Sequence, residues 1–121
     1  MIVEDNQVNQ RVVTAVLRKR GLAIEIANDG MEALAKLEKS ADYDLVLMDV
    51  QMPVLDGLEA TRMIRKNPKW DALPIVAMTA HAMNGDRERC LAAGMNGYIS
   101  KPVHPSHLLD VVDGYLVQKT A

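Results

Sequence analysis

Short apolar segments alternate with helical patterns along the chain. Four of these segments have no polar alternation, which is typical of strands covered by helices on both faces. They are residues 1–3, 45–48, 75–78 and 98–99. We expect all four in the middle of a sheet. The segment over residues 23–27 contains a glutamate, so we place that strand at an edge, where part of one face lies near water.

Helical patterns with recognisable ends fill the intervals. An apolar stripe and a basic last turn before Gly21 predict the first helix over residues 6–20. The stripe consists of Val8, Val12, Ala15, Val16 and Leu17. The D-x-x-E spacing of a capping carboxylate and a following glutamate starts the second helix at Asp29 and the third at Asp56. A fourth helix is predicted over residues 84–93, and a fifth from Pro105 to about residue 116.

Five strand–helix units of this length predict an α/β fold. Such units cross over right-handed and give a doubly wound, five-stranded parallel sheet with five helices on two faces. We expect the flavodoxin-like strand order 2-1-3-4-5, which makes the first and third strands neighbours. Ligands of such folds bind beyond the carboxyl ends of the strands, so the side chains that follow each strand are the candidate functional residues.

Polar side chains follow four of the five predicted strands. With the expected order, Glu4 and Asp5 lie beside Asp49, while Thr79 and Lys101 follow the next two strands. Two unit charges ~4 Å apart repel by roughly 4 kcal/mol at an effective dielectric of ~20, so three carboxylates in one pocket require a cation. Oxygen ligands favour Mg²⁺. A carboxylate nucleophile, a metal, a lysine and a hydroxyl are together suited to phosphoryl transfer.

The motifs around these residues resemble the receiver domain of two-component response regulators. They are I-V-E-D-N at residues 2–6, L-M-D-V-Q-M-P at 47–53, D-G at 56–57, M-T-A at 78–80 and K-P at 101–102. The longer strings over residues 48–62 and 78–83 are most similar to receivers of hybrid sensor histidine kinases. The resemblance covers almost the whole chain in order, and we expect residues 1–121 to form one receiver (phosphoacceptor) domain.

The resemblance implies a role for each matching residue. Asp49 corresponds to the phosphoacceptor. The Mg²⁺ ligands implied are Glu4, Asp5, Asp49 and the backbone carbonyl of Gln51. Thr79 resembles the switch hydroxyl and Lys101 the lysine that neutralises phosphoryl oxygens.

Two further features are implied by the same resemblance. Tyr98 corresponds to the aromatic side chain that swings inward when Thr79 is drawn to the phosphoryl group. The Lys101–Pro102 bond is expected to be cis, a turn that would aim the lysine ammonium at Asp49.

Each residue also has a structural explanation that involves no chemistry. Glu4 and Asp5 are suited to capping the first helix, and an aspartate after a strand is commonly a cap or a turn. Thr79 as a turn residue, Lys101 as a surface lysine and Tyr98 as half-buried packing are the alternatives at the other positions. His104 and His107 share the start of a helix and are interpreted as surface residues, with metal binding as the alternative. Cys90 is expected to pack in the core.

The resemblance implies a switch rather than an enzyme that turns over a diffusible substrate. A histidine kinase or a histidine phosphotransfer domain would be the phosphoryl donor in a phosphorelay, with slow loss of the group by hydrolysis. The fourth helix, fifth strand and fifth helix would form a surface for partners or phosphorylation-dependent dimers. An aspartate-nucleophile phosphatase of the haloacid dehalogenase type needs a second aspartate two residues after the first, where this chain has Gln51. A degenerate receiver that only binds a partner is the remaining alternative.

Composition and net charge limit the kinds of partner and the location expected for this chain. The formal net charge is −2, which offers no broad basic surface to nucleic acid. Apolar residues make up 49% of the chain, enough for an independent core, but no apolar run approaches the ~20 residues of a membrane span. The single cysteine cannot form an internal disulfide. We therefore expect a cytoplasmic domain that contacts neither nucleic acid nor membrane.

Overall fold

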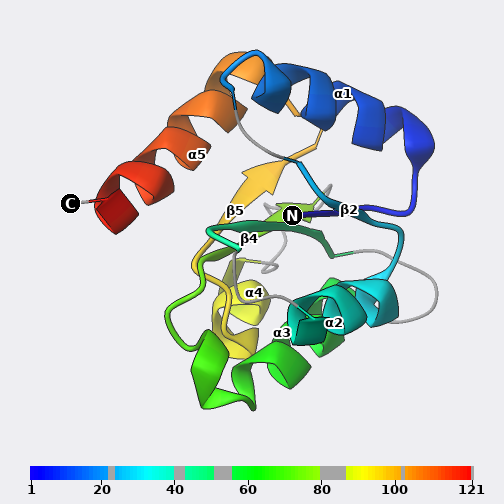
Figure 1. The fold of residues 1–121 in the computed structure, drawn as a ribbon, viewed down its shortest axis with the longest axis vertical. Coiled ribbons are helices and arrows are strands. Elements are labelled where there is room, and N and C mark those ends of the chain that lie inside the picture. Colours follow the sequence, from blue (N-terminus) through cyan, green and yellow to red (C-terminus); the bar gives the residue numbers. More distant parts are fainter. Residues whose placement is uncertain (22–23, 40–42, 51–55, 80–86, 102, 121) are drawn as a thin grey trace.

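A parallel sheet lies between two layers of helices in the computed structural model (Figure 1). The structure describes the chain except residues 22–23, 40–42, 51–55, 80–86, 102 and 121, and it describes residues 87 and 116–120 by their backbone alone. The elements in chain order are β1 (Ile2–Val3), α1 (Gln7–Arg18), β2 (Ile26–Ala27), α2 (Gly30–Lys39), β3 (Val46–Asp49), α3 (Gly57–Arg65), the 3₁₀ turn η1 (Pro68–Trp70), β4 (Ile75–Thr79), α4 (Arg87–Ala93), β5 (Gly97–Ser100) and α5 (Pro105–Thr120).

The strand order is β2-β1-β3-β4-β5, and every pair is parallel, as the sequence predicts. The edge position of β2 is confirmed. The expectation that residues 98–99 lie in the middle of the sheet is wrong, because β5 is the other edge strand. Its two-residue apolar run is too short to reveal the difference, and among its residues Ile99 alone is buried while Tyr98 is partly exposed.

Two separate cores flank the sheet. The core between the sheet and helices α1 and α5 contains Val13, Leu17, Leu108 and Val112. The other core lies against α2, α3 and α4 and is closed by Trp70 of η1. Figure 1 shows the same division, with α1 and α5 above the sheet and the other helices below it. No helix in the described part of the chain has the length and apolar character needed to cross a membrane.

Helix α1 starts where the sequence predicts but buries a different face. The side chain of Asn6 caps the helix by accepting from the backbone N–H groups of Val8 (2.9 Å) and Asn9 (3.2 Å). The buried residues are Gln10, Val13, Thr14 and Leu17, spaced i, i+3, i+4 and i+7. Val8 and Val12 are instead 66% and 44% exposed, and Ala15 is exposed as well, so the predicted stripe is wrong at these three positions. Gln10 is buried there because its amide bonds the Glu4 carbonyl and Asn28, whereas the buried Thr14 hydroxyl has no hydrogen-bond partner among the described residues.

The other helix ends mostly follow the predicted signals. Asp29 and Asp56 accept from the backbone N–H groups of Glu32 and Glu59, each at 2.8 Å, which confirms both caps. Helix α1 ends at Arg18 rather than residue 20, because the last N–H groups bond in a tight turn that closes at Gly21 (φ 78°). Helix α4 ends before Gly94 (φ 109°) as predicted, while the predicted start over residues 84–86 lies outside the described residues. Helix α5 continues to Thr120 instead of ending near residue 116.

Candidate functional site

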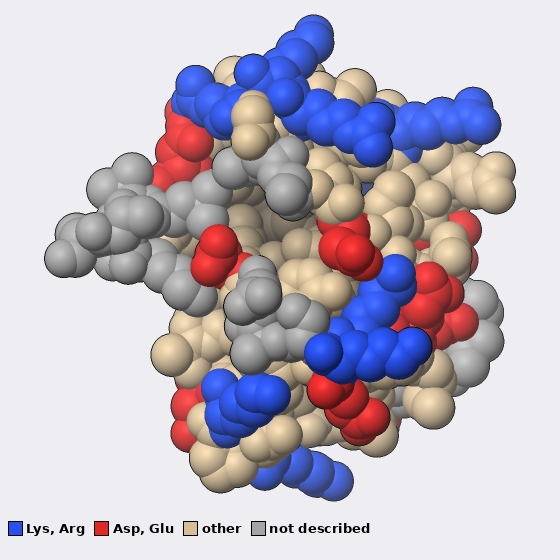
Figure 2. All heavy atoms as spheres, in the orientation of Figure 1, with Lys and Arg blue, Asp and Glu red and all other residues tan. Residues whose placement is uncertain are grey.

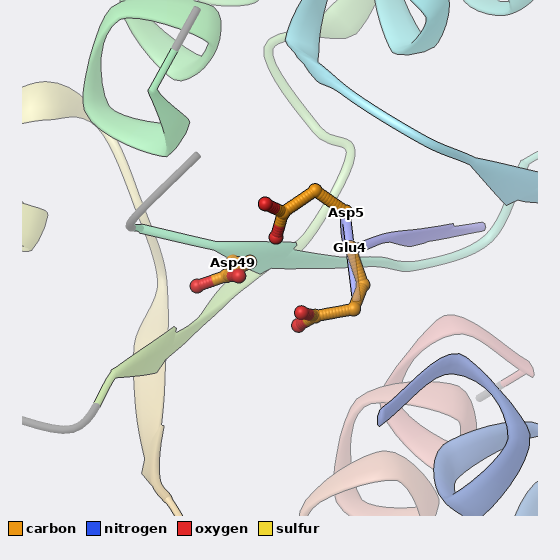
Figure 3. Close-up of side chains that lie close together, drawn as sticks. All are labelled: Glu4, Asp5 and Asp49. Carbon is orange, nitrogen blue, oxygen red and sulfur yellow. The ribbon is translucent and has the colours of Figure 1, made fainter. Parts of the chain in front are cut away.

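Three carboxylates meet at the carboxyl end of the sheet. Glu4 and Asp5 follow β1, Asp49 ends β3, and the two strands are paired with Val3 opposite Met48. One carboxylate oxygen from each residue lies within 4.8 Å of the others. Figure 3 shows Glu4 and Asp5 leaving the end of β1 in different directions, with Asp49 extending from β3 beside them. The juxtaposition predicted from the strand order is therefore present.

The three carboxylates differ in their exposure to solvent. The side chains of Glu4 and Asp49 are 1% and 2% exposed, whereas Asp5 lies at the surface. Burial disfavours the charged form of a carboxylate, so the buried members contribute most of the repulsion in the cluster. Asp5 adds a charge that water partly screens.

Lys101, which directly follows the edge strand β5, supplies a positive charge to the site. Its Nζ lies 3.0 Å from Oδ1 of Asp49 and 3.4 Å from Oε2 of Glu4. The backbone places it there, since the N–H of Lys101 donates to the carbonyl of Thr79 at 2.8 Å. Among the described residues, one ammonium against three carboxylates leaves an excess of negative charge at the site.

The excess negative charge affects the pKa of Glu4. Its burial raises the pKa of the carboxyl, and the negative charge of Asp49 raises it further, while Lys101 and the side chain of Asn9 act in the opposite direction. Oε2 of Glu4 has no hydrogen-bond donor among the described residues, although it is buried. A buried carboxylate oxygen without a donor, in a group of three carboxylates, fits a hard divalent cation such as Mg²⁺.

Thr79 and Tyr98 lie on adjacent strands and on the same face of the sheet. Thr79 ends β4 and is 1% exposed, and its Cα partner on β5 is Ser100. Tyr98 pairs with Ala77, two residues before Thr79, and packs against the core on the α2–α3–α4 side. Because side chains alternate along strands, the hydroxyl and the ring project on the same side.

Two sequence-based assignments lie outside the described residues. They are the Gln51 carbonyl as a metal ligand and the cis Lys101–Pro102 bond, since residues 51 and 102 are not described. His104 and His107 are both exposed near the start of α5, and neither belongs to the group of carboxylates described above. Cys90, a residue of α4, is buried in the core, as expected.

Sequence reasoning missed three residues that shape the site. Asn9 and Gln10 on α1 both donate hydrogen bonds to Glu4, one to its side chain and one to its backbone. Gly57 lies against the backbone after Asp49, where a Cβ would overlap the Asp49 carbonyl oxygen. The available signals were two consecutive amides that begin four residues after the acidic pair, about one helical turn on, and a glycine directly after a helix cap.

The charge of Glu4 gives the metal-free domain an unusual pH dependence. Between the ordinary carboxyl pKa and the raised native pKa of Glu4, the native state holds a proton that the unfolded chain has released. The free energy of unfolding in EDTA should therefore fall as pH rises through this interval. Glu4→Gln should remove that decline and be more stable than wild type at neutral pH.

This prediction is measured by urea unfolding at a series of pH values, with wild type compared with the variant. Glu88→Gln, at an exposed position on α4, is the control and should keep the wild-type slope. A Glu4→Gln protein whose stability follows the wild-type pH curve would contradict the electrostatic description of the cluster.

The fold and the site together define a phosphoacceptor receiver class, and the comparisons agree. The response regulator receiver domain family matches residues 1–113, so the chain belongs to that family. The chain is 44% identical over 119 residues to hybrid signal transduction histidine kinase I of Dictyostelium discoideum, with 93% of this chain covered. It is 36% identical over 115 residues to the signal transduction histidine-protein kinase BarA of Escherichia coli, with 95% covered. The chain spans only 7% and 12% of the length of these two relatives.

Solved structures show the same fold. The receiver domain of the sensor histidine kinase PA1611 from Pseudomonas aeruginosa is 45% identical, with a TM-score of 0.87 over 94% of this chain and 93% of that one. That crystal structure has a magnesium ion coordinated in the active site cleft. The chemotaxis protein CheY4 of Vibrio cholerae is 31% identical, with a TM-score of 0.88 and 94% of each chain covered.

Proposed function

We propose that this chain is a Mg²⁺-dependent phosphoacceptor in a two-component phosphorelay and that Asp49 carries the phosphoryl group. The observation that supports the proposal is the contact between Asp49 and Lys101, 3.0 Å from Oδ1 to Nζ, within the cluster of three carboxylates. An ammonium beside the nucleophilic oxygen pairs with a phosphoryl oxygen once the transfer has occurred.

The transfer forms one bond and breaks one. A carboxylate oxygen of Asp49 attacks the phosphorus of a phosphohistidine, the new O–P bond gives an acyl phosphate, and the N–P bond electrons return to the imidazole of the donor. Mg²⁺ would be held by Glu4, Asp5 and Asp49, with the Gln51 carbonyl as a proposed fourth ligand. When bound, it neutralises charge on the transferring group. The Lys101 ammonium and the Thr79 hydroxyl bind phosphoryl oxygens of the product.

The partner in this proposal is a histidine kinase or a histidine phosphotransfer domain. The hybrid histidine kinases among the relatives support that class of donor. Hydrolysis of the acyl phosphate then resets the domain slowly, so the chain acts as a switch and not as a turnover enzyme. The proposal treats residues 1–121 as one receiver domain working in the cytoplasm, without contact to nucleic acid or membrane. The α4–β5–α5 surface is the proposed contact for a partner or a phosphorylation-dependent dimer.

The charge distribution agrees with a protein partner. On the face of the molecule drawn in Figure 2, Lys and Arg side chains gather along the edge where α1 lies. Acidic and basic side chains are interspersed over the rest of that face. A narrow basic row on this one face, in a chain with a formal net charge of −2, favours a protein partner over nucleic acid. The haloacid dehalogenase alternative lacks its acid at position 51, and the complete set of carboxylates, hydroxyl and lysine disfavours a degenerate receiver.

The test is phosphorylation of the purified chain. A small-molecule phosphodonor or a phosphohistidine protein should add one phosphoryl group by intact mass in the presence of Mg²⁺, and EDTA should prevent the addition. A chain that stays unmodified with both donors in saturating Mg²⁺ would refute the proposal.

The switch part of the proposal predicts that Thr79→Ala separates phosphorylation from conformational change. The variant should accept a phosphoryl group but shift Tyr98 less, because the hydroxyl that distinguishes the two states is gone. NMR of the Tyr98 ring after addition of beryllofluoride measures the shift. Ser100→Ala is the control, since it removes an exposed hydroxyl from the Cα partner of Thr79. Equal Tyr98 shifts in Thr79→Ala and wild type would rule out the coupling.

A further inference from the structure

Two consecutive amide side chains on α1 reach back to Glu4. Nδ2 of Asn9 donates to Oε1 of the Glu4 carboxylate at 3.3 Å. Nε2 of Gln10 donates to the Glu4 backbone carbonyl at 2.5 Å and to Oδ1 of Asn28, after β2, at 2.8 Å. Neighbouring helical residues point about 100° apart, so one amide reaches the side chain and the other the backbone of the same residue. Helix α1 therefore fixes Glu4 through both its carboxylate and its backbone carbonyl.

These contacts make the two oxygens of Glu4 unequal. Oε1 accepts from the backbone N–H of Asn6 at 3.2 Å as well as from Asn9. Oε2 has no donor among the described residues and lies 3.4 Å from the Lys101 ammonium. The last torsion of a glutamate has broad, roughly two-fold preferences, so intrinsic rotamer energy does not hold a carboxylate in one orientation. Hydrogen bonds at one oxygen hold it here.

Asn9 also lines a small cavity beside the Glu4 carboxylate. The cavity has a volume of about 140 Å³, and its walls include Glu4, Asn9, Lys101 and Val103. That volume holds several water molecules at the density of the liquid, about 30 Å³ each. Loss of the Asn9 amide would therefore leave Oε1 held by the Asn6 N–H alone, with water in this space competing for the same oxygen.

We propose that Asn9 is a positioning residue for the metal site: its side-chain amide engages Oε1 of Glu4 and so presents Oε2 to the cation. The inference rests on the proposed Mg²⁺-dependent function. Asn9 does not touch the cation or the phosphoryl group, so its effect belongs to metal affinity. Residues that orient a ligand from behind commonly change metal affinity 10- to 100-fold when mutated. A single long hydrogen bond, supported by the Asn6 N–H, should fall at or below the lower end of that range.

Asn9→Leu tests the proposal, because leucine has a similar size and no donor. Mg²⁺ titrations of the isotopically labelled proteins, followed by amide NMR shifts, should give a Kd about three- to tenfold weaker than that of wild type. Phosphorylation by a small-molecule donor should need correspondingly more Mg²⁺ for half-maximal rate, while the rate at saturating Mg²⁺ stays within about twofold of wild type. A merely structural role would not produce this split. Gln7→Leu makes the same amide-to-leucine change at an exposed position of α1 and should leave the Kd unchanged.

The outcomes separate this inference from the proposed function. Wild type that binds no Mg²⁺ overturns both. Wild type that binds Mg²⁺ while Asn9→Leu binds it equally well overturns the role of Asn9 alone, and so does an unchanged Kd with a lower maximal rate. Asn9→Ala, which introduces no branched side chain, is measured in parallel in case the leucine variant folds poorly, and the same threefold or greater weakening is expected.

Discussion

Asp49→Asn should accept no phosphoryl group under conditions that modify the wild-type chain. The amide has nearly the shape of the carboxylate, but its oxygen is a poor nucleophile and no longer carries the charge that pairs with Lys101. Removal of a nearly buried negative charge from a repulsive cluster should not unfold the domain, so the loss reports chemistry rather than stability. Intact-mass measurement after incubation with a phosphohistidine donor and Mg²⁺ gives the result directly.

Asp71→Asn is the matched control for this experiment. Asp71 is an exposed residue next to η1, at the opposite end of β4 from Thr79, and the same carboxyl-to-amide change there should leave labelling at the wild-type level. If Asp49→Asn is labelled as fully as wild type, the phosphoryl group resides on another residue and the assignment of Asp49 is wrong.

Gly57→Ala should strongly destabilise the domain, whereas Gly114→Ala should stabilise it. A Cβ at Gly57 would overlap the carbonyl oxygen of Asp49 and lie 2.9 Å from both Cγ of Met48 and Cα of Val50. Two of these three atoms are backbone, so relief requires α3 to move away from the end of β3. We expect a loss of about 3 kcal/mol, in the upper range for overpacking of a buried position.

Gly114 provides the opposite case in the same chain. It lies in the interior of α5, and no atom lies within 4 Å of a Cβ added there. Alanine is favoured over glycine at an exposed helical position by about 0.5–1 kcal/mol. Urea unfolding followed by the fluorescence of Trp70, the single tryptophan, measures both changes. A Gly57→Ala protein within about 1 kcal/mol of wild type would show that the close approach costs little.

Gly57 also connects the fold with the site. Its N–H donates to the carbonyl of Val50 at 3.1 Å, so the start of α3 contacts the backbone of the residue that directly follows Asp49. A variant that folds but moves α3 should lose Mg²⁺ affinity together with stability. The D-G pair at residues 56–57 is visible in the sequence, but the closeness of the backbone that requires glycine is not.

The arrangement of the site residues could be predicted because it depends on strand ends. Each parallel strand brings its last residue to one edge of the sheet, so strand order alone juxtaposes Glu4, Asp5 and Asp49. The caps at Asp29 and Asp56 were predictable because each capping hydrogen bond joins residues only three positions apart in the sequence. Local rules are sufficient wherever partners are close in the sequence or are aligned by a regular lattice.

Other features depended on contacts that local patterns do not encode. The buried face of α1 was predicted through Val8 and Val12, but Gln10 is buried because it reaches the Glu4 carbonyl and Asn28, 18 residues away. The apolar run at residues 98–99 is too short to mark β5 as an edge strand, although the expected strand order implies it. The continuation of α5 from residue 116 to Thr120 also has no signal in the local pattern. The sequence by itself determined the α/β class, the strand order and the charged residues at the strand ends, because periodicity and strand-end positions are local properties. Tertiary structure alone decided which carboxylates are buried, which oxygen of Glu4 accepts from Asn9, and that position 57 requires glycine. Each of these depends on distances between segments that only packing brings together.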